Sequence, residues 1–255
     1  MKEAGANATV RRSDQQAAVE HRSTARDTSP SLDAIEIFKT IAPDSRIRFE
    51  RRCRWRRYQP GEPIIGYLDT SNEVFFLAAG QARVSIYSSQ GKTITFCDLR
   101  PGDMFGEYAA IHRAPRSTSV EAQTECLVAS MTATAFQEML QSEPSIMMGL
   151  IQHLVEKVRA LTTRVYEFSA LAVSNRIQAE VLRLAYSAPR DSAGAHISPA
   201  PTHTDIANRT STHREAVTRE LNRLSKLGII ERRARTLTVK NMQRLAAMVR
   251  EATGE

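Results

Sequence analysis

Short apolar runs separated by turn residues dominate the chain up to about residue 130. The clearest runs are 74–77, 82–87 and 93–99. This rhythm is typical of antiparallel β structure, because each short strand needs a tight turn at its end. We therefore predict a β domain here. Its turn signals are Pro60-Gly61, Ala79-Gly80, Gln90-Gly91 and Pro101-Gly102.

The N-terminal part of the sequence shows a different pattern. Residues 1–31 are rich in Ala, Ser, Thr, Gln and charge without apolar periodicity, so we predict a disordered tail. Leu32, Ile35 and Phe38 then follow at helical spacing, which predicts a helix over 32–41.

A long amphipathic segment begins after Pro144. Its apolar residues recur at spacings of three and four, which predicts one long helix with the seam of a short coiled coil. A single helix packing on its own domain is the alternative, but such a helix needs a wider apolar stripe. We therefore favour a homodimer. The seam residues are Leu150, Leu154, Val158, Leu161, Val165, Phe168 and Ala172.

The last third reads as short helices followed by two strands. Residues 173–186 predict an amphipathic helix and 187–201 a turn-rich connector. Two capping-box spacings start further helices, and a turn lies between them at Thr210 and Ser211. Gly228 ends the second helix, and 229–239 predicts a wing of two strands. The capping pairs are Thr202 with Asp205 and Thr212 with Glu215.

The charge and hydropathy of the chain limit the kinds of partner that it is expected to bind. The 255 residues carry 35 Lys and Arg against 28 Asp and Glu, a net charge of +7 that favours a polyanion. Residues 201–240 alone hold nine basic and four acidic residues. No apolar run is long enough for a membrane span, and the polar N-terminus lacks a signal-peptide pattern. We expect a cytoplasmic protein without a membrane partner.

The sequence contains no pattern typical of a metal site or an enzyme active site. Cys53, Cys97 and Cys126 are far apart and show no metal-ligand spacing, so we expect no metal. No nucleophile elbow, phosphate-binding Walker loop or paired acid-base motif is present, so we expect no enzyme activity. A cluster of arginines is read as a solvated face beside an early strand, with auxiliary DNA or partner contact as the alternative. These are Arg46, Arg48, Arg51, Arg52, Arg54, Arg56 and Arg57.

The segment FGEYAAIHRAPRSTSV, residues 105–120, is the strongest candidate site. Gly106 allows a tight bend, and small residues after it let a phosphate approach main-chain N–H groups. Arg116 supplies a planar fork for the phosphate. Glu107 accepts only, so we assign it a ribose hydroxyl, and Ser117 offers a hydroxyl. A surface ion pair of Glu107 with Arg116 is the alternative. We expect Arg116 to serve the ligand rather than the core.

This segment resembles the phosphate-binding cassette of cyclic-nucleotide-binding domains. With the later helices, the resemblance extends to the cyclic AMP receptor protein (catabolite activator) and FNR-type regulator family. It implies a β-roll that binds cyclic AMP or cyclic GMP and a long helix that forms the dimer axis beside the base. The family's iron-sulfur relatives carry an N-terminal cysteine-rich segment, which is absent before Cys53. The implied ligand-binding residues are Gly106, Glu107, Tyr108, Ala109, Arg116, Ser117, Thr162 and Thr163.

One departure bears on the base. The family's usual hydroxyl on the long helix is Leu161 here, with Thr162 next to it. In resembling domains, a hydroxyl at Ser117 can also meet guanine. The resemblance therefore implies weak selectivity, with both nucleotides binding within about tenfold of each other and cyclic AMP the favoured effector.

The segment HREAVTREL resembles the recognition helix of the same family. Arg pairs with guanine and Glu accepts from cytosine in the major groove, and Arg214, Glu215 and Arg219 align with the family's base-reading residues. The match implies a TGTGA-like half-site. Ser211 stands where the family usually has Gly, so it must accept a strained conformation or the turn shifts. The expected DNA contacts are Thr212, His213, Arg214, Glu215, Thr218, Arg219, Arg232 and Arg233.

Together these patterns predict an α+β protein. We expect a disordered tail over 1–31, an antiparallel β-roll of the jelly-roll type over 32–143, a dimerisation helix over 144–172 and a winged helix-turn-helix over 173–255. Its expected role is transcription regulation, with double-stranded DNA, a second copy and RNA polymerase as partners. A regulator of the same fold that ignores cyclic nucleotides or senses another signal is the alternative.

Overall fold

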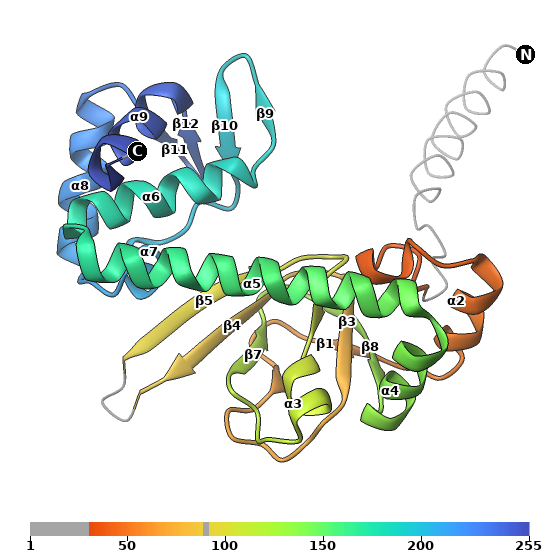
Figure 1. Cartoon of the computed structure of the whole chain (residues 1–255). Helices are drawn as coiled ribbons and strands as arrows, with labels where there is room; N and C mark the ends of the chain where they lie inside the picture. The colour runs from red at the N-terminus through yellow and green to blue at the C-terminus, as the bar shows by residue number, and fades with distance from the viewer. Residues whose placement is uncertain (1–30, 89–91, 255) are drawn as a thin grey trace, which may run out of the picture. The chain divides into compact units, whose positions relative to one another are not determined.

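The computed structural model describes residues 31–88 and 92–254. Apart from Ser31, the tail predicted over 1–31 lies outside the described residues. From Leu32 onward the chain forms one unit, in which a β-roll comes first, a long helix follows, and a small helical domain with its own sheet comes last (Figure 1). The predicted α+β class and the order of its parts are confirmed.

Two antiparallel sheets form the roll. Their strand orders are β1-β8-β3-β6 and β2-β7-β4-β5. Leu77, Val120 and Val128 are almost fully buried in the core that both sheets share. The strands predicted at 82–87 and 93–99 are confirmed, and the one at 74–77 extends to Ala79. The strands are β1 (Arg54–Tyr58), β2 (Pro63–Ile65), β3 (Val74–Ala79), β4 (Ala82–Tyr87), β5 (Thr93–Leu99), β6 (Met104–Phe105), β7 (Ser119–Ala122) and β8 (Cys126–Met131).

Gly80 shows why the predicted turns need glycine. Its φ of +88° lies in the left-handed region, and a Cβ there would stand 2.2 Å from the carbonyl oxygen of Glu125. Any side chain at this position would therefore push β3 and β4 away from the turn before β8.

The helix predicted over 32–41 is wrong. Only η1 (Glu36–Phe38) is helical there, as one 3₁₀ turn. Leu32, Ile35 and Phe38 are fully buried, and a spacing of three suits successive 3₁₀-like turns as well as an α-helix. Three helices were missed, α2 (Pro43–Glu50), α4 (Ala133–Ser142) and the C-terminal α9 (Met242–Thr253). Each has a start signal in the sequence: Pro43 at the first turn of α2, a capping Thr132 before α4 and a capping Asn241 before α9.

The arginine cluster lies on α2, on β1 and between them. Arg46 pairs with Asp33 at 2.6 Å and Arg52 with Glu138 at 2.6 Å. Three further arginines of the cluster also have carboxylate partners on the roll or at the start of the long helix. These ion pairs favour the solvated-face interpretation over a free basic patch.

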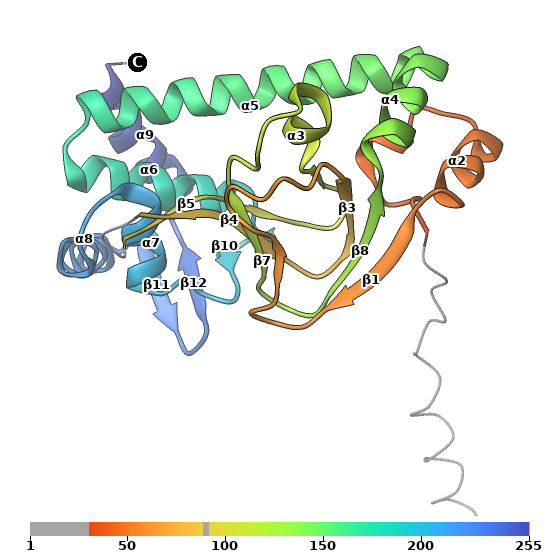
Figure 2. The same ribbon diagram turned by 90° about the horizontal axis from the view of Figure 1, so that it is seen from below.

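Helix α5 (Pro144–Ala170) runs along the roll, with α3 (Glu107–His112) beneath it (Figure 2). The predicted seam is only partly correct. Leu150 is buried against the roll, because this end of α5 packs on η1 and α4, and Ala172 lies beyond the helix. The exposed apolar stripe instead consists of Met148, Ile151, Val155, Val158, Leu161, Val165 and Phe168.

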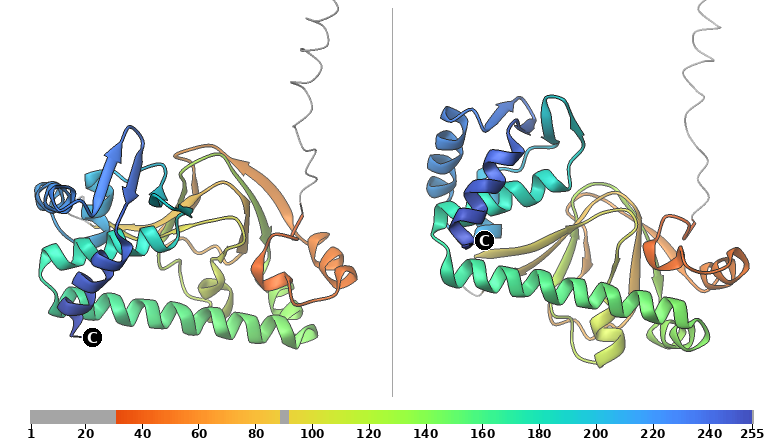
Figure 3. Two further views of the ribbon diagram at one scale, coloured as in Figure 1. Left: turned by 90° about the horizontal axis from the view of Figure 1, so that it is seen from above. Right: turned by 45° about the horizontal axis from the view of Figure 1, so that its top comes forward.

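The C-terminal part contains a three-helix core, a four-stranded sheet and a final helix. The connector predicted over 187–201 holds a short hairpin whose second strand pairs with the wing, so the sheet order is β11-β12-β10-β9. Helix α9 packs against α6 (Figure 3). The elements are α6 (Val173–Tyr186), β9 (Arg190–Asp191), β10 (Gly194–Ile197), α7 (His203–Thr210), α8 (Arg214–Lys226), β11 (Ile230–Arg233), β12 (Thr236–Val239) and α9 (Met242–Thr253).

Within the described residues, no helix is both long enough and apolar enough to cross a membrane.

Candidate functional site

The candidate nucleotide site is built around the tight turn into α3. Gly106 adopts φ +82°, directly after the buried strand β6. A Cβ there would stand 2.8 Å from Nη1 of Arg116 and 3.0 Å from the carbonyl oxygen of Glu73. Glycine is therefore required both by the left-handed backbone and by the close approach of Arg116.

Arg116 is held by the protein itself. Its side chain is 2% exposed and donates to Ser71 Oγ at 3.1 Å, to the Gly106 carbonyl at 2.8 Å and to the Glu73 carbonyl at 2.9 Å. It also lies over the ring of Phe75, 5.5 Å from its centroid. Burial lowers the pKa of its guanidinium, and the neighbouring carboxylate of Glu73 partly opposes this effect. The expectation that Arg116 has no part in the protein's own packing is wrong, because it ties the loop before β3 to the Gly106 turn. Its contact with a ligand stays a prediction.

Glu107 has an unpredicted partner. Its carboxylate is 2% exposed and accepts from Lys157 Nζ of α5 at 2.7 Å. The same ammonium lies 5.2 Å from the centroid of the Tyr108 ring. His153, one turn earlier on α5, has a buried Nε2 without a hydrogen-bond partner. Burial lowers the pKa of His153, with a smaller contribution from the Lys157 charge.

The remaining predicted ligand residues are more scattered. Ala109 is buried in α3, whereas Tyr108 and Ser117 are exposed. Thr162 and Thr163 are also exposed, and their hydroxyls donate to carbonyls one turn earlier in α5. Among the described contacts, Lys157 is the residue that joins α5 to the cassette, not either threonine. The alternative of a Glu107–Arg116 ion pair is not what the structure shows.

Three residues of this site were not predicted from the sequence. Lys157 is the one lysine of α5. Its position beside the exposed apolar stripe was the only feature of the sequence that could have indicated a role in the site. Ser71 and Glu73 belong to the loop before β3, and nothing in their spacing indicates contact with residue 116.

The candidate DNA interface is the α7–α8 pair. The capping box at the start of α7 is confirmed, since Thr202 and Asp205 exchange both hydrogen bonds. Ser211 takes a left-handed conformation at φ +48°, so it accepts the strained turn. The second capping box is wrong: α8 begins at Arg214 with His213 as an extended N-cap that makes no side-chain bond.

The polar face of α8 is open. Arg214, Glu215 and Arg219 are exposed near its N-terminal half. Thr218 is half-buried, and its hydroxyl donates to the Arg214 carbonyl and lies 2.7 Å from Nδ1 of His203. Burial lowers the pKa of His203, and so do the charges of Arg232 and Arg214. The wing and α8 therefore contribute to one positive region.

The wing also presents its arginines to solvent. Arg232 and Arg233 are exposed at the end of β11, and Arg233 pairs with Glu231 at 2.7 Å. All eight predicted DNA residues thus lie on α8, its preceding turn or the wing. Their contact with DNA stays a prediction.

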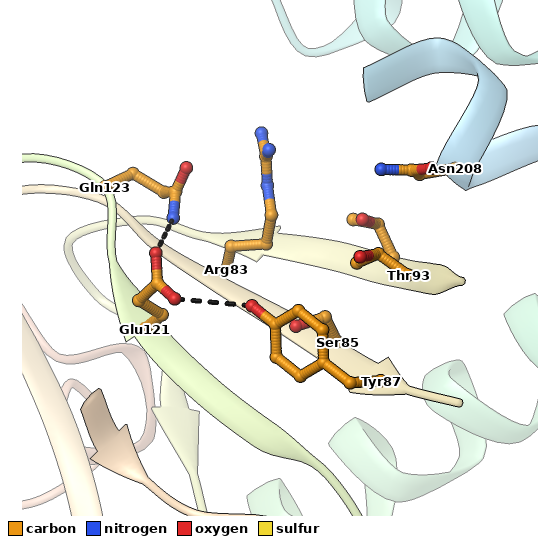
Figure 4. A pocket seen from close by; sticks show the side chains of 8 residues that line it. Arg83, Ser85, Tyr87, Thr93, Glu121, Gln123 and Asn208 are labelled. Atoms are coloured by element: carbon orange, nitrogen blue, oxygen red, sulfur yellow. Dashed lines mark hydrogen bonds between the residues drawn. The ribbon is translucent and has the colours of Figure 1, made fainter. Parts of the chain in front are cut away.

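A separate small pocket of about 120 Å³ lies where β4, β5 and β7 face α7 (Figure 4). Thr95 lines it with a buried hydroxyl that has no hydrogen-bond partner. No cassette residue lines this pocket, so it is distinct from the predicted nucleotide site. Its lining is Arg83, Ser85, Tyr87, Thr93, Thr95, Glu121, Gln123 and Asn208.

Fold and site together define a cyclic-nucleotide-binding domain joined to a winged helix-turn-helix. The family profile described as cyclic nucleotide-binding domain matches residues 55–143, and that described as Crp-like helix-turn-helix domain matches residues 175–248. The chain belongs to the cyclic AMP receptor protein and FNR family of DNA-binding transcription regulators.

The sequences of curated relatives align with most of this chain. The cAMP-activated global transcriptional regulator Vfr of Pseudomonas aeruginosa is 26% identical over 191 residues, covering 73% of this chain and 89% of Vfr. The cAMP-activated global transcriptional regulator CRP of Salmonella typhimurium is 24% identical over 192 residues, covering 75% of this chain and 91% of CRP.

Solved structures share the fold. A CooA mutant from Carboxydothermus hydrogenoformans has a TM-score of 0.69 at 21% identity, covering 78% of this chain and 89% of that one. The c-di-GMP responsive regulator CLP from Xanthomonas campestris has a TM-score of 0.68 at 18% identity, covering 78% and 99%.

Proposed function

We propose that this protein is a homodimeric transcription regulator whose affinity for a pseudo-palindromic DNA site is controlled by cyclic AMP or cyclic GMP bound at the α3 cassette. One observation carries the proposal. Glu107 and Arg116 are both buried beside the left-handed turn of Gly106, and α3, which begins at Glu107, lies beneath the helix that leads to the DNA-binding domain (Figure 2).

Ligand binding requires a rearrangement of the site. Glu107 is bonded to Lys157, so a ribose hydroxyl must displace or share that ammonium. Arg116 has five N–H donors, and three described bonds go to Ser71, Gly106 and Glu73. A phosphate at the start of α3 would use its remaining donors or replace the carbonyls. The exchange at Glu107 changes the contact between α3 and α5, because Lys157 belongs to α5.

The dimer is proposed from the exposed stripe of α5. Val158 and Val165 are 62% and 64% exposed in one protomer. Aliphatic residues repeated every three or four positions along a helix are buried well by a second copy of the same helix. Thr162 lies within this stripe and would face the partner protomer, from where it could reach the base in the partner's cassette.

DNA recognition is assigned to α8. In a dimer, two such helices would enter successive major grooves about 34 Å apart. Arg214, Glu215 and Arg219 would read base edges, as the resemblance to a TGTGA-like half-site implies, and the wing arginines would contact phosphates. We also propose that the regulator acts in the cytoplasm and contacts RNA polymerase there.

The second candidate is a regulator of this fold that answers another signal. The Lys157–Glu107 ion pair favours this second candidate, because the carboxylate that we assign to a ribose hydroxyl already has a cationic partner. Fluorescence anisotropy of a labelled duplex with two TGTGA-like half-sites separates the two candidates. We expect either nucleotide to raise DNA affinity in the wild type and to have much less effect in Glu107→Gln. Equal DNA affinity with and without both nucleotides would favour the second candidate.

A further inference from the structure

The β-roll and the winged helix-turn-helix are joined by a cluster of opposite charges centred on Asp98 of β5. Asp98 accepts from Arg83 Nε of β4 at 2.9 Å and from Arg209 of α7. Arg83 also reaches across, donating from Nη1 to Asp205 of α7 at 2.6 Å. Two arginines and two aspartates thus alternate across the boundary between sensor and DNA-binding domain.

This cluster is shielded from water. The side chain of Arg209 is 5% exposed, and those of Arg83, Asp98 and Asp205 are each 30% exposed or less. Partly buried charge pairs are screened less than surface pairs, and charge-assisted hydrogen bonds are directional. The cluster therefore fixes the orientation of α7 on β4 and β5 as well as their contact. A third link is Arg100, which donates to the Ser187 carbonyl at 2.8 Å.

The cluster continues into the long helix. Arg209 lies 3.6 Å from Glu180 of α6, and Glu180 accepts from Arg164 of α5 at 3.0 Å. Arg164 also donates to the Arg209 carbonyl at 3.2 Å. Lys157, which holds Glu107, is two helical turns before Arg164 and so shares its face of α5. One face of one helix therefore contacts both the cassette and the charge cluster.

We propose that Asp98, Arg83, Asp205 and Arg209 form an ionic latch that restrains the DNA-binding domain while the cassette is closed by Lys157. The proposal rests on the proposed function. Helix α7 leads through the Ser211 turn directly into α8, so holding α7 on the roll also holds the recognition helix in the orientation tied to the closed cassette. Release of Lys157 from Glu107 shifts α5 and Arg164, which weakens the latch.

Two variants test the latch from the sensor side, where they leave the Asp205 capping box intact. Asp98→Asn keeps the shape and removes the charge, and Arg83→Gln removes both bonds of that arginine. Glu125→Gln is the matched control, because it breaks the exposed Arg57–Glu125 pair within the roll. Thermal melting establishes that each variant is folded, and the two independent variants keep the test decisive if one of them does not fold.

DNA affinity is measured by anisotropy at one salt concentration without nucleotide. We expect Asp98→Asn and Arg83→Gln each to bind DNA at least about fivefold more tightly than wild type, in the range of ordinary allosteric couplings. The double variant should bind DNA at least as tightly as the tighter single variant, because Asp98→Asn removes the Asp98–Arg209 pair and Arg83→Gln removes the Arg83–Asp205 pair. Glu125→Gln should match wild type. Cyclic nucleotide affinity by calorimetry should rise in the latch variants as well, since the competent state becomes more populated.

Unchanged or weaker nucleotide-free DNA binding in both folded variants would overturn the latch. If wild-type DNA binding ignores cyclic nucleotides while Asp98→Asn still raises it, the latch stands and the proposed effector fails. If the wild type responds to nucleotide and the variants bind DNA as the wild type does, the effector stands and the latch fails.

Discussion

Lys157 Nζ lies 2.7 Å from Glu107 Oε1, so a cation from the long helix neutralises the buried carboxylate at the head of α3. This contact joins the sensor roll to α5 at the residue that the sequence assigns to ribose. A buried carboxylate without such a partner costs far more than the pair itself stabilises. The pair is therefore a structural contact, and under the proposed function an entering ribose would have to alter it.

We first predict the effect of removing the cation. Lys157→Met leaves Glu107 buried and unpaired, and we expect a loss of about 1 to 3 kcal/mol in the free energy of unfolding, since Lys157 is itself partly exposed. Adding Glu107→Gln should recover most of that loss, because the neutral amide needs no cation. Urea denaturation measures both variants. Additive losses in the double variant would contradict the pairing.

A second prediction concerns Arg116. Arg116→Ala leaves the carbonyls of Gly106 and Glu73 without their donor, and we expect the free energy of unfolding to fall by about 3 kcal/mol. Arg116→Lys is the matched control, because it keeps the charge but cannot bond all three partners. It should lie between alanine and wild type. If Arg116→Ala melted within a degree of wild type, the side chain would not hold the turn.

The third prediction tests the exposed stripe of α5. Val165→Asp places a charge in the proposed dimer seam, and because Val165 is 64% exposed in one protomer, the fold should survive. We expect a folded monomer by sedimentation and circular dichroism. Glu156→Gln, on another face of α5, should remain a dimer. A dimeric Val165→Asp protein would place the interface elsewhere.

Most of the fold was predictable because its signals are local. Gly80 and Gly106 mark turns that only glycine fits, and the apolar periods of β3, β4, β5, α5 and α6 were visible in the sequence. The 3₁₀ turn at Glu36–Phe38 was not predictable, because its apolar spacing also fits an α-helix. Which apolar residues of α5 stay exposed depends on which face of the helix packs against the roll. That packing is a long-range contact, so the spacing along α5 alone does not reveal it.

The residues of the candidate sites also fall into those that local sequence could predict and those that it could not. Glu107, Arg116 and the α8 residues could be singled out because each group lies within one short segment of the sequence, and their contacts with ligand and DNA stay predictions. Lys157 and Asp98 act on partners 50 and 111 residues away. No spacing in one sequence reveals such pairs, since any charged residue on an exposed face has the same local pattern.

A fourth prediction separates base reading from phosphate contact. Arg219→Ala should weaken binding by about 1 to 3 kcal/mol at one position of each half-site and relax the preference there. The double variant Arg232→Ala and Arg233→Ala should weaken binding to every sequence and reduce its salt dependence. Both are measured by anisotropy on a set of single-base duplex variants over several salt concentrations. A uniform loss in Arg219→Ala would mean that α8 does not read bases.

Calorimetric titration with cyclic AMP and cyclic GMP, with and without the duplex, decides whether nucleotide and DNA binding are coupled. We predict that both nucleotides bind, with dissociation constants within about tenfold of each other, and that DNA tightens nucleotide binding by the same factor by which nucleotide tightens DNA binding. A lack of binding by both nucleotides, with DNA present or absent, would contradict this prediction.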